Sequence, residues 1–181
     1  MRKAPVAPTP ERLHARALRY LERFATTSAH LRRVLLRRAL RDAELLELDP
    51  VAVRRDVEAV VARVTAAGLI DDRLFAASRA RRLAETGRSP ARIRLALLEK
   101  GLDAEAVAAA MSELAEEKGD PELAAAIAYA RKRRLGPWRP AEEREAHAAR
   151  DLAALARAGF AYRVARRIME ASDPAELKEA S

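Results

Sequence analysis

Apolar residues along this chain recur every three or four positions, which is the spacing of one buried face of an α-helix. The clearest run is a set of valines that predicts a helix despite their β-branched side chains: Val53, Val57, Val60, Val61 and Val64. The same spacing predicts a first helix with four residues on one face: Leu13, Ala17, Leu21 and Phe24. We find no convincing strand pattern, so we expect an all-α protein.

Glycines mark where these helices end. Gly68 follows the valine run and can adopt the left-handed backbone that closes a helix. Asp71 or Asp72 can then cap the next helix. Gly101 and Gly159 follow helical segments in the same way. The repeated order of helix, glycine, apolar residue and helix predicts a helical array whose function lies on its surface.

The predicted helices group in threes. We expect three-helix repeats at residues 11–68, 69–119 and 120–172, preceded by a disordered arm at 1–10 and followed by a frayed tail at 173–181. A single repeat is too small to bury its apolar face alone, so neighbours should stack. The prediction is therefore a tandem array of three-helix repeats that is elongated, curved and superhelical.

The composition excludes several classes of protein. Cysteine is absent, which removes disulfides and thiolate metal sites and fits a reducing compartment. Charged residues make up 34% of the chain, and no apolar run approaches the roughly 20 residues of a membrane span. The first ten residues lack the apolar core of a signal peptide. We expect a cytoplasmic protein without a membrane partner.

The net charge of +8 is distributed unevenly. Residues 1–67 carry +6, residues 68–119 carry 0 and residues 120–181 carry +2. An excess near the N-terminus favours a polyanionic partner, either nucleic acid or an acidic protein surface. A GC-rich genome would explain arginine in place of lysine, but it would not explain where the charges cluster.

Arginines are spaced so that several share one helix face. The first predicted helix carries four opposite its apolar face: Arg12, Arg16, Arg19 and Arg23. The second carries three at every fourth position: Arg33, Arg37 and Arg41. Like charges at this spacing repel by about a few tenths of a kcal/mol each, which a polyanion would relieve. The alternative is a solvated face that Glu11 and Glu22 partly neutralise. Two further clusters complete the candidate partner-binding residues: Arg79, Arg82, Arg88 and Arg92, then Arg131, Arg133 and Arg134.

Candidate chemistry is sparse. The three histidines have no partner at metal-ligand spacing: His14, His30 and His147. Asp71 and Asp72 could form a carboxylate pair for acid–base chemistry or Mg²⁺, but capping explains them better because no third carboxylate is near in sequence. Trp138 in a basic loop is either a base-stacking residue or, more simply, a helix-packing anchor. We expect no enzyme, no cofactor and no metal.

Three motifs resemble those of the RecX family of RecA regulators. The first, residues 68–76, reads GLIDDRLFA and resembles that family's G-[YF]-[LI]-[DN]-[DE]-x-R-[FY]-A. The second, residues 82–102, resembles R…G-x-G-P-x-R-I-x…L-x-x-K-G-[IL]. The third, residues 17–33, resembles the opening A-L-x-x-L…S-x-x-E-L-x-x-[KR]. The resemblance covers about residues 12–115.

The chain departs from these motifs at a few positions. Leu74 stands where the family usually has arginine, and Ser89 where it usually has glycine. His30 occupies a usually acidic site, and one extra residue precedes Ser28. Leu74 puts one surface contact in doubt, whereas the other departures leave the expected fold unaffected.

The resemblance implies a monomer of tandem three-helix repeats that binds along the groove of a RecA–DNA filament. Members of the family typically inhibit filament growth, ATP hydrolysis and strand exchange, and some also bind DNA, so roles in DNA repair, recombination and the SOS response are implied. The alternative is a helical-repeat protein that binds single- or double-stranded DNA without a RecA partner. The effect on RecA ATPase activity distinguishes the two.

Overall fold

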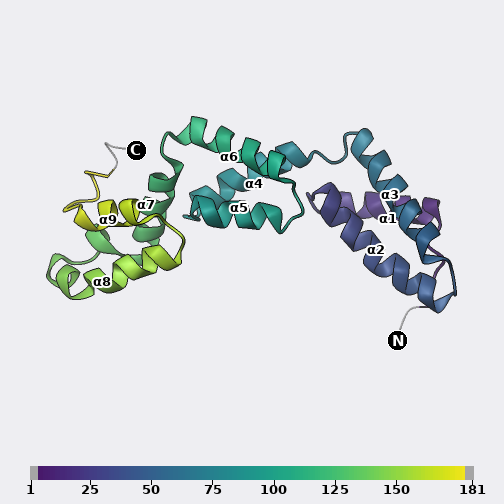
Figure 1. The fold of residues 1–181 in the computed structure, drawn as a ribbon, viewed down its shortest axis with the longest axis horizontal. Helices are drawn as coiled ribbons and strands as arrows, with labels where there is room; N and C mark the ends of the chain where they lie inside the picture. Colours follow the sequence, from purple (N-terminus) through teal and green to yellow (C-terminus); the bar gives the residue numbers. More distant parts are fainter. Residues whose placement is uncertain (1–3, 178–181) are drawn as a thin grey trace. The chain divides into compact units, whose positions relative to one another are not determined.

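The computed structural model describes residues 4–177, apart from the side chain of Lys118. Within these residues the chain forms nine α-helices, one short 3₁₀ helix and no strand (Figure 1). The elements are α1 (Pro10–Leu21), α2 (Ser28–Leu45), α3 (Pro50–Ala66), α4 (Asp72–Glu85), α5 (Pro90–Leu98), α6 (Ala104–Lys118), α7 (Pro121–Arg133), η1 (Gly136–Trp138), α8 (Ala141–Arg157) and α9 (Tyr162–Glu170). The predicted all-α class is confirmed.

The chain divides into two compact units. The first unit comprises Met1–Phe75 and Lys100–Leu102, and the second comprises Ala76–Glu99 and Asp103–Ser181. The second unit thus holds most of the second and third predicted repeats, and the division into three repeats stays a prediction.

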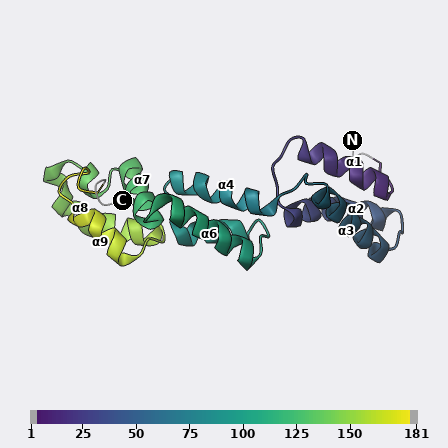
Figure 2. The same ribbon diagram turned by 90° about the horizontal axis from the view of Figure 1, so that it is seen from above.

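The first unit is a bundle of α1, α2 and α3, which lie together in both views (Figures 1 and 2). The five valines whose spacing predicts the buried face of α3, Val53 to Val64, are all at most 5% exposed, whereas Val51 in the first turn is exposed. They pack in one core with Leu13 of α1 and with Leu31 and Leu35 of α2. The helical period of the apolar residues therefore determines which face of each helix is buried.

Each helix of the first unit begins at a side-chain cap. Thr9, Thr27 and Asp49 accept hydrogen bonds from backbone N–H groups in the first turns of α1, α2 and α3. These caps satisfy donors that have no partner inside the helix. The hydroxyl of Thr27 also donates to the carbonyl of Lys100 at 2.6 Å, which ties the loop after α5 to the start of α2.

The adjacent aspartates before α4 have different roles. Asp71 Oδ1 accepts from the backbone N–H of Leu74 at 2.8 Å and caps the helix. Asp72 instead accepts from both the backbone N–H and the hydroxyl of Ser28, at the start of α2. Capping is confirmed for Asp71, whereas the contact of Asp72 joins segments that are far apart in the sequence.

The second unit contains α5 to α9 and most of α4. Its largest core lies among α7, α8 and α9, where Leu123, Leu155, Val164 and Ile168 are buried. Trp138 packs against this core, which favours a helix-packing anchor over a base-stacking residue. Ser89, Asp103 and Asp120 cap α5, α6 and α7.

A buried ion pair holds the segment between α7 and α8. Asp151 is 2% exposed, lies 2.9 Å from Arg139 Nη2 and accepts from the backbone N–H of Gly136 at 3.1 Å. Arg144 donates to backbone carbonyls of Pro137 and Arg139. Because these hydrogen bonds satisfy the buried charge, they favour one arrangement of the irregular segment.

The first predicted helix ends earlier than its pattern indicates. α1 stops at Leu21, so the placement of Phe24 on its buried face is wrong: Phe24 is 54% exposed. Its ring lies 5.0 Å from that of Tyr20. The chain leaves the helix after Leu21, six residues before Thr27 adopts the extended backbone with which it caps α2.

Both predicted terminal segments are ordered next to the helices. Pro8 is buried and Thr9 caps α1, within the arm predicted to be disordered at 1–10. Leu177, within the tail predicted to fray, is 2% exposed and packs in the core of the second unit. Residues 1–3 and 178–181 lie outside the described part of the chain.

Gly68 and Gly87 close α3 and α4 with the same backbone geometry. Both have positive φ, +71° and +78°, and the N–H that follows each bonds to a carbonyl five residues earlier. A Cβ at Gly68 would meet nothing within 4 Å, whereas one at Gly87 would lie 2.7 Å from the backbone nitrogen of Tyr129. The close approach at Gly87 brings the α4–α5 turn against α7.

Gly87→Ala should therefore destabilise the protein more than Gly68→Ala. The left-handed backbone alone costs an alanine about 1–2 kcal/mol, and overlap with α7 should add about 1–3 kcal/mol. Urea unfolding followed by circular dichroism measures both free energies of unfolding. Equal losses for the two variants would contradict a tight contact between Gly87 and Tyr129.

Candidate nucleic-acid and protein interface

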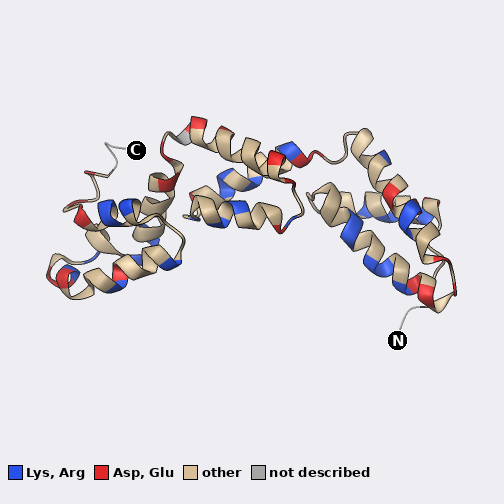
Figure 3. Ribbon diagram, viewed as in Figure 1, with Lys and Arg blue, Asp and Glu red and all other residues tan. Residues whose placement is uncertain are grey.

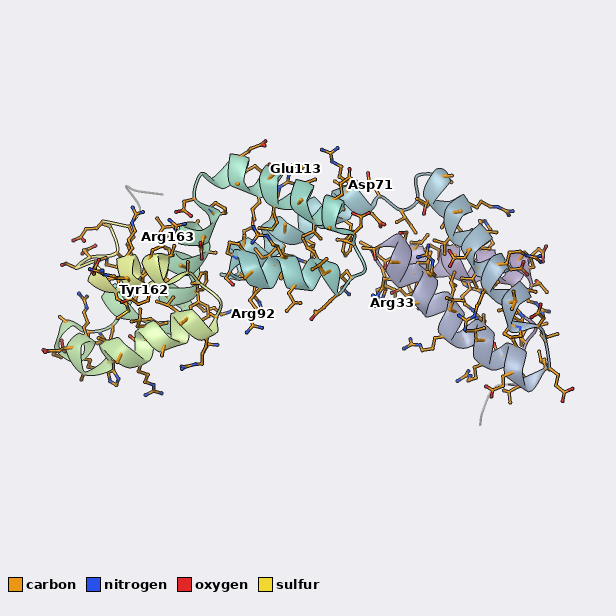
Figure 4. All side chains as sticks on the ribbon, in the orientation of Figure 1. Arg33, Asp71, Arg92, Glu113, Tyr162 and Arg163 are labelled. Carbon is orange, nitrogen blue, oxygen red and sulfur yellow. The ribbon has the colours of Figure 1, made fainter. Side chains whose placement is uncertain are left out.

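The α2 helix carries the most regular basic face of the first unit. Arg33, Arg37 and Arg41 are all exposed, and Figure 3 shows positive residues recurring along this helix. Arg33, labelled in Figure 4, has its Nη2 3.4 Å from His30 Nδ1. Within residues 4–177 no ion pair involves Arg37, whereas Arg41 lies 4.0 Å from Asp42. The sequence prediction of an exposed arginine row on this helix agrees with the structure.

His30 reports the positive potential at the start of that face. Its pKa is lowered first by burial and then by the charges of Lys100, Arg33 and Arg37. The unfolded chain therefore binds a proton at His30 more readily than the folded protein does. The contribution of His30 to the free energy of unfolding is complete above the ordinary histidine pKa, and it is lost as the pH falls through that value toward the lower pKa of the folded protein.

The predicted arginine stripe on α1 is interrupted. Arg12, Arg19 and Arg23 are exposed, but Arg23 lies beyond the end of the helix and so does not continue its face. Arg12 donates to the carbonyl of Ala7 at 3.2 Å. Arg16 is half-buried, and burial followed by the charge of Arg38 lowers its pKa. The stripe of four is thus wrong as a single helix face.

Asp42 is a buried carboxylate that the arginine spacing did not indicate. It is 4% exposed, and Arg38 Nε lies 3.6 Å from its Oδ2. Its position next to Ala43 and three residues after the buried Ala39 is the sequence signal that places it on the inward face. Asp42 therefore neutralises part of the charge at the end of α2 and leaves the excess nearer to Arg33 and Arg37.

In the second unit, two predicted arginine clusters meet around one hollow. This basic hollow, of about 380 Å³, is lined by Thr86, Arg88, Arg92, Tyr129, Lys132 and Arg133, among others. Arg88 and Arg92 come from the α4–α5 region, whereas Lys132 and Arg133 come from the end of α7. The two clusters are about forty residues apart in sequence, so only the tertiary structure brings them together.

Three close contacts surround the basic hollow. Gly87 places the α4–α5 turn against the backbone of Tyr129. The hydroxyl of Ser89 donates to the carbonyl of Ala158 at 2.8 Å, and Arg92 Nη2 donates to the carbonyl of Arg157 at 3.3 Å. Figure 4 shows Arg92 extending from α5. The α8–α9 turn is thereby fixed at the same place.

The other candidate arginines of the second unit are distributed around this surface. Arg79 is half-buried and lines a neighbouring hollow of about 340 Å³ together with Arg88 and Arg92. Arg82, Arg131 and Arg134 are exposed, and none of them lines either hollow. Arg134 has φ +54° and ends α7 in the left-handed conformation.

Sequence reasoning placed one further contributor to the basic hollow in a basic cluster and missed another. Lys132 belongs to the basic run 131–134 but was not among the candidate partner-binding residues. Tyr129 was not predicted. The guanidinium of Arg133 lies over its ring, 5.2 Å from the centroid, and the centroid of the Phe160 ring lies 5.5 Å away. Nothing in the local sequence indicates this packing.

The described residues contain no group of three or more acidic or histidine side chains that could hold a metal ion. Asp71 and Asp72 are engaged by backbone and hydroxyl donors of Leu74 and Ser28. In the same part of the chain, no helix is long and apolar enough to cross a membrane. The geometry that remains is a set of exposed cationic surfaces.

Known proteins similar to this chain are regulators. A curated protein of Myxococcus xanthus (strain DK1622), described as "Regulatory protein RecX", is 40% identical over 174 residues, which are 96% of this chain and 91% of that protein. The chain belongs to the RecX family. A RecX regulatory protein of Agrobacterium fabrum (strain C58) is 29% identical over 84% of this chain and 79% of its own length.

Two further comparisons concern the RecX fold. The family model described as "RecX, second three-helix domain" matches residues 71–111, which contain α4, α5 and the first half of α6. A solved structure titled "Crystal structure of regulatory protein RecX" has a TM-score of 0.60 and 21% identity, and the match covers 90% of this chain and 72% of that one. The helical-repeat fold inferred from the RecX motifs is confirmed.

The pKa of His30 provides a test of the α2 basic face in this RecX protein. Replacing Arg33 and Arg37 with glutamine should raise the His30 pKa toward its ordinary value, because two of the charges that oppose protonation are removed. An NMR titration of the histidine ring protons measures the shift. A matched double variant on α3, Arg54→Gln with Arg63→Gln, should leave it unchanged; equal shifts in both variants would contradict a local effect.

Proposed function

We propose that this protein binds the RecA–DNA filament and lowers the recombinase and ATPase activity of RecA. The single observation that carries the proposal is its membership of a family of regulatory proteins over almost its whole length. The family resemblance indicates RecA as the target. The positive charge of the chain gives a physical reason for binding, because cationic faces attract an anionic partner.

The α2 face supports an anionic partner. Arg33, Arg37 and Arg41 project from successive turns of one helix, where their mutual repulsion disfavours the free state slightly. A partner that places acidic side chains or phosphates along this face removes the repulsion and adds favourable charge pairs. The absence of a neutralising carboxylate around Arg37 within residues 4–177 leaves this charge available.

A regulatory function also agrees with the chemistry of the surface. The acidic pair at the start of α4 is occupied by capping and by the contact with Ser28. The cationic surfaces offer binding and steering of an anionic polymer, which requires no reacting group. We therefore propose that the protein acts by occupying the filament rather than by a chemical step.

Charge reversal at two positions tests the proposal. The double variant Arg33→Glu with Arg37→Glu should raise the concentration needed for half-maximal inhibition of RecA ATPase on single-stranded DNA by roughly tenfold or more, because two attractive contacts become repulsive. The measurement is a titration of the protein into a steady-state ATPase assay.

The matched control reverses the same number of charges on α3. Arg54→Glu with Arg63→Glu should shift the half-maximal concentration far less, since these exposed arginines lie on another helix of the first unit. Unchanged inhibition by the α2 variant would contradict the role of this face. Binding of DNA without any effect on RecA would favour the alternative of a DNA-binding protein that acts without RecA.

A further inference from the structure

We infer that the basic hollow of the second unit binds the phosphodiester backbone of a single nucleic-acid strand, independently of base sequence. The inference deepens the proposed function, since it names the part of the protein that would contact the nucleic acid of the filament. The inference rests on the proposed function only for the statement that the strand belongs to a RecA–DNA filament. The binding of a strand by the hollow requires no RecA.

The charge around the basic hollow is of one sign. Arg88, Arg92, Lys132 and Arg133 all line it, and no carboxylate belongs to its lining within the described residues. The hydroxyl of Thr86 donates to the carbonyl of Leu83 at 2.8 Å, so its oxygen can still accept but adds no charge. Forked guanidinium groups match the oxygens of a phosphate and hold it through paired hydrogen bonds.

A neighbouring hollow extends the same surface. It shares Arg88 and Arg92 with the basic hollow and adds Arg79, whose Nε is buried without a hydrogen-bond partner in residues 4–177. Glu99 also lines this second hollow. Cations therefore continue from Arg133 on α7 to Arg79 on α4, a path that suits a polymer of phosphates better than one isolated anion.

Charge density favours a nucleic-acid strand over an acidic protein segment. A strand carries one negative charge on every nucleotide, so successive phosphates can neutralise several neighbouring cations and release their counterions. An acidic segment usually separates its carboxylates by neutral side chains. The concave shape also admits one flexible backbone, whose phosphates can turn inward.

Tyr129 supports the hollow rather than reading bases. The Arg133 guanidinium lies 5.2 Å from its ring centroid, and the Phe160 ring lies 5.5 Å away at an interplanar angle of 59°. Arg133 would have to leave before a base could stack on that part of the ring. Contacts through phosphates alone do not distinguish bases, so oligonucleotides of different sequence should bind alike.

The test measures binding of fluorescent oligothymidine by the full chain, without RecA, through fluorescence anisotropy at several salt concentrations. The test variant is Arg88→Gln with Lys132→Gln, because neither side chain forms a hydrogen bond or an ion pair within the described part of the chain. We expect its affinity to fall roughly tenfold at low salt. Its plot of log affinity against log salt should be less steep by about 1.4, the value for two lost phosphate contacts on a single strand.

The matched control is Arg94→Gln with Arg150→Gln, which removes two exposed charges of the same unit that do not line the hollow. It should keep most of the affinity, and urea midpoints should show that both variants fold. Equal weakening by the two variants would overturn the inference, as would absence of binding by the unmodified protein. Two competitors of the bound oligothymidine test the other ligands. If polyglutamate displaces it equally well at equal charge, the surface binds acidic protein, and if inorganic triphosphate displaces it equally well at equal phosphate concentration, the surface binds free anions; either result would contradict the inference.

Discussion

The contact between the α4–α5 turn and the backbone of Tyr129 determines where the positive charge of the second unit gathers. Gly87 permits this contact because its positive φ and missing side chain let the turn come within van der Waals distance of α7. Arg88 follows the glycine directly, and Lys132 lies one helical turn beyond Tyr129. A single close approach thus brings together cations from distant parts of the chain.

Charge in this protein is divided between structural and exposed groups. Arg139 pairs with the buried Asp151, and Arg38 lies against the buried Asp42, so these arginines serve the fold. Arg37 and Arg88, by contrast, are exposed and form no ion pair within residues 4–177. Buried pairs fix local structure, whereas exposed cations attract anionic polymers over distances limited by salt.

Features encoded by neighbouring residues were predictable from the sequence. The helix starts at Thr27, Ser89 and Asp103 follow from capping chemistry, and the buried face of α3 follows from the spacing of its valines. The exposed arginine row of α2 follows from the same periodicity. These elements need only the residues within one or two helical turns.

Features that depend on packing between distant segments were not predictable. The bond between Asp72 and Ser28 and the position of Tyr129 in the basic hollow depend on helices that meet only after folding. The early end of α1 is an intermediate case, because the apolar pattern continues to Phe24 although the backbone turns away after Leu21. Sequence periodicity identifies candidate charges, and tertiary structure decides which of them act together.

The three tyrosines allow the most direct measurement of where an anionic polymer binds. Tyr129 lines the basic hollow, Tyr162 is 67% exposed on α9 outside it, and Tyr20 lies in the first unit. With fluorotyrosine incorporated, ¹⁹F NMR during titration with oligothymidine should show the Tyr129 resonance moving to saturation while that of Tyr162 stays in place. Movement of the Tyr162 resonance with a static Tyr129 would contradict the assignment of the nucleic-acid strand to the basic hollow.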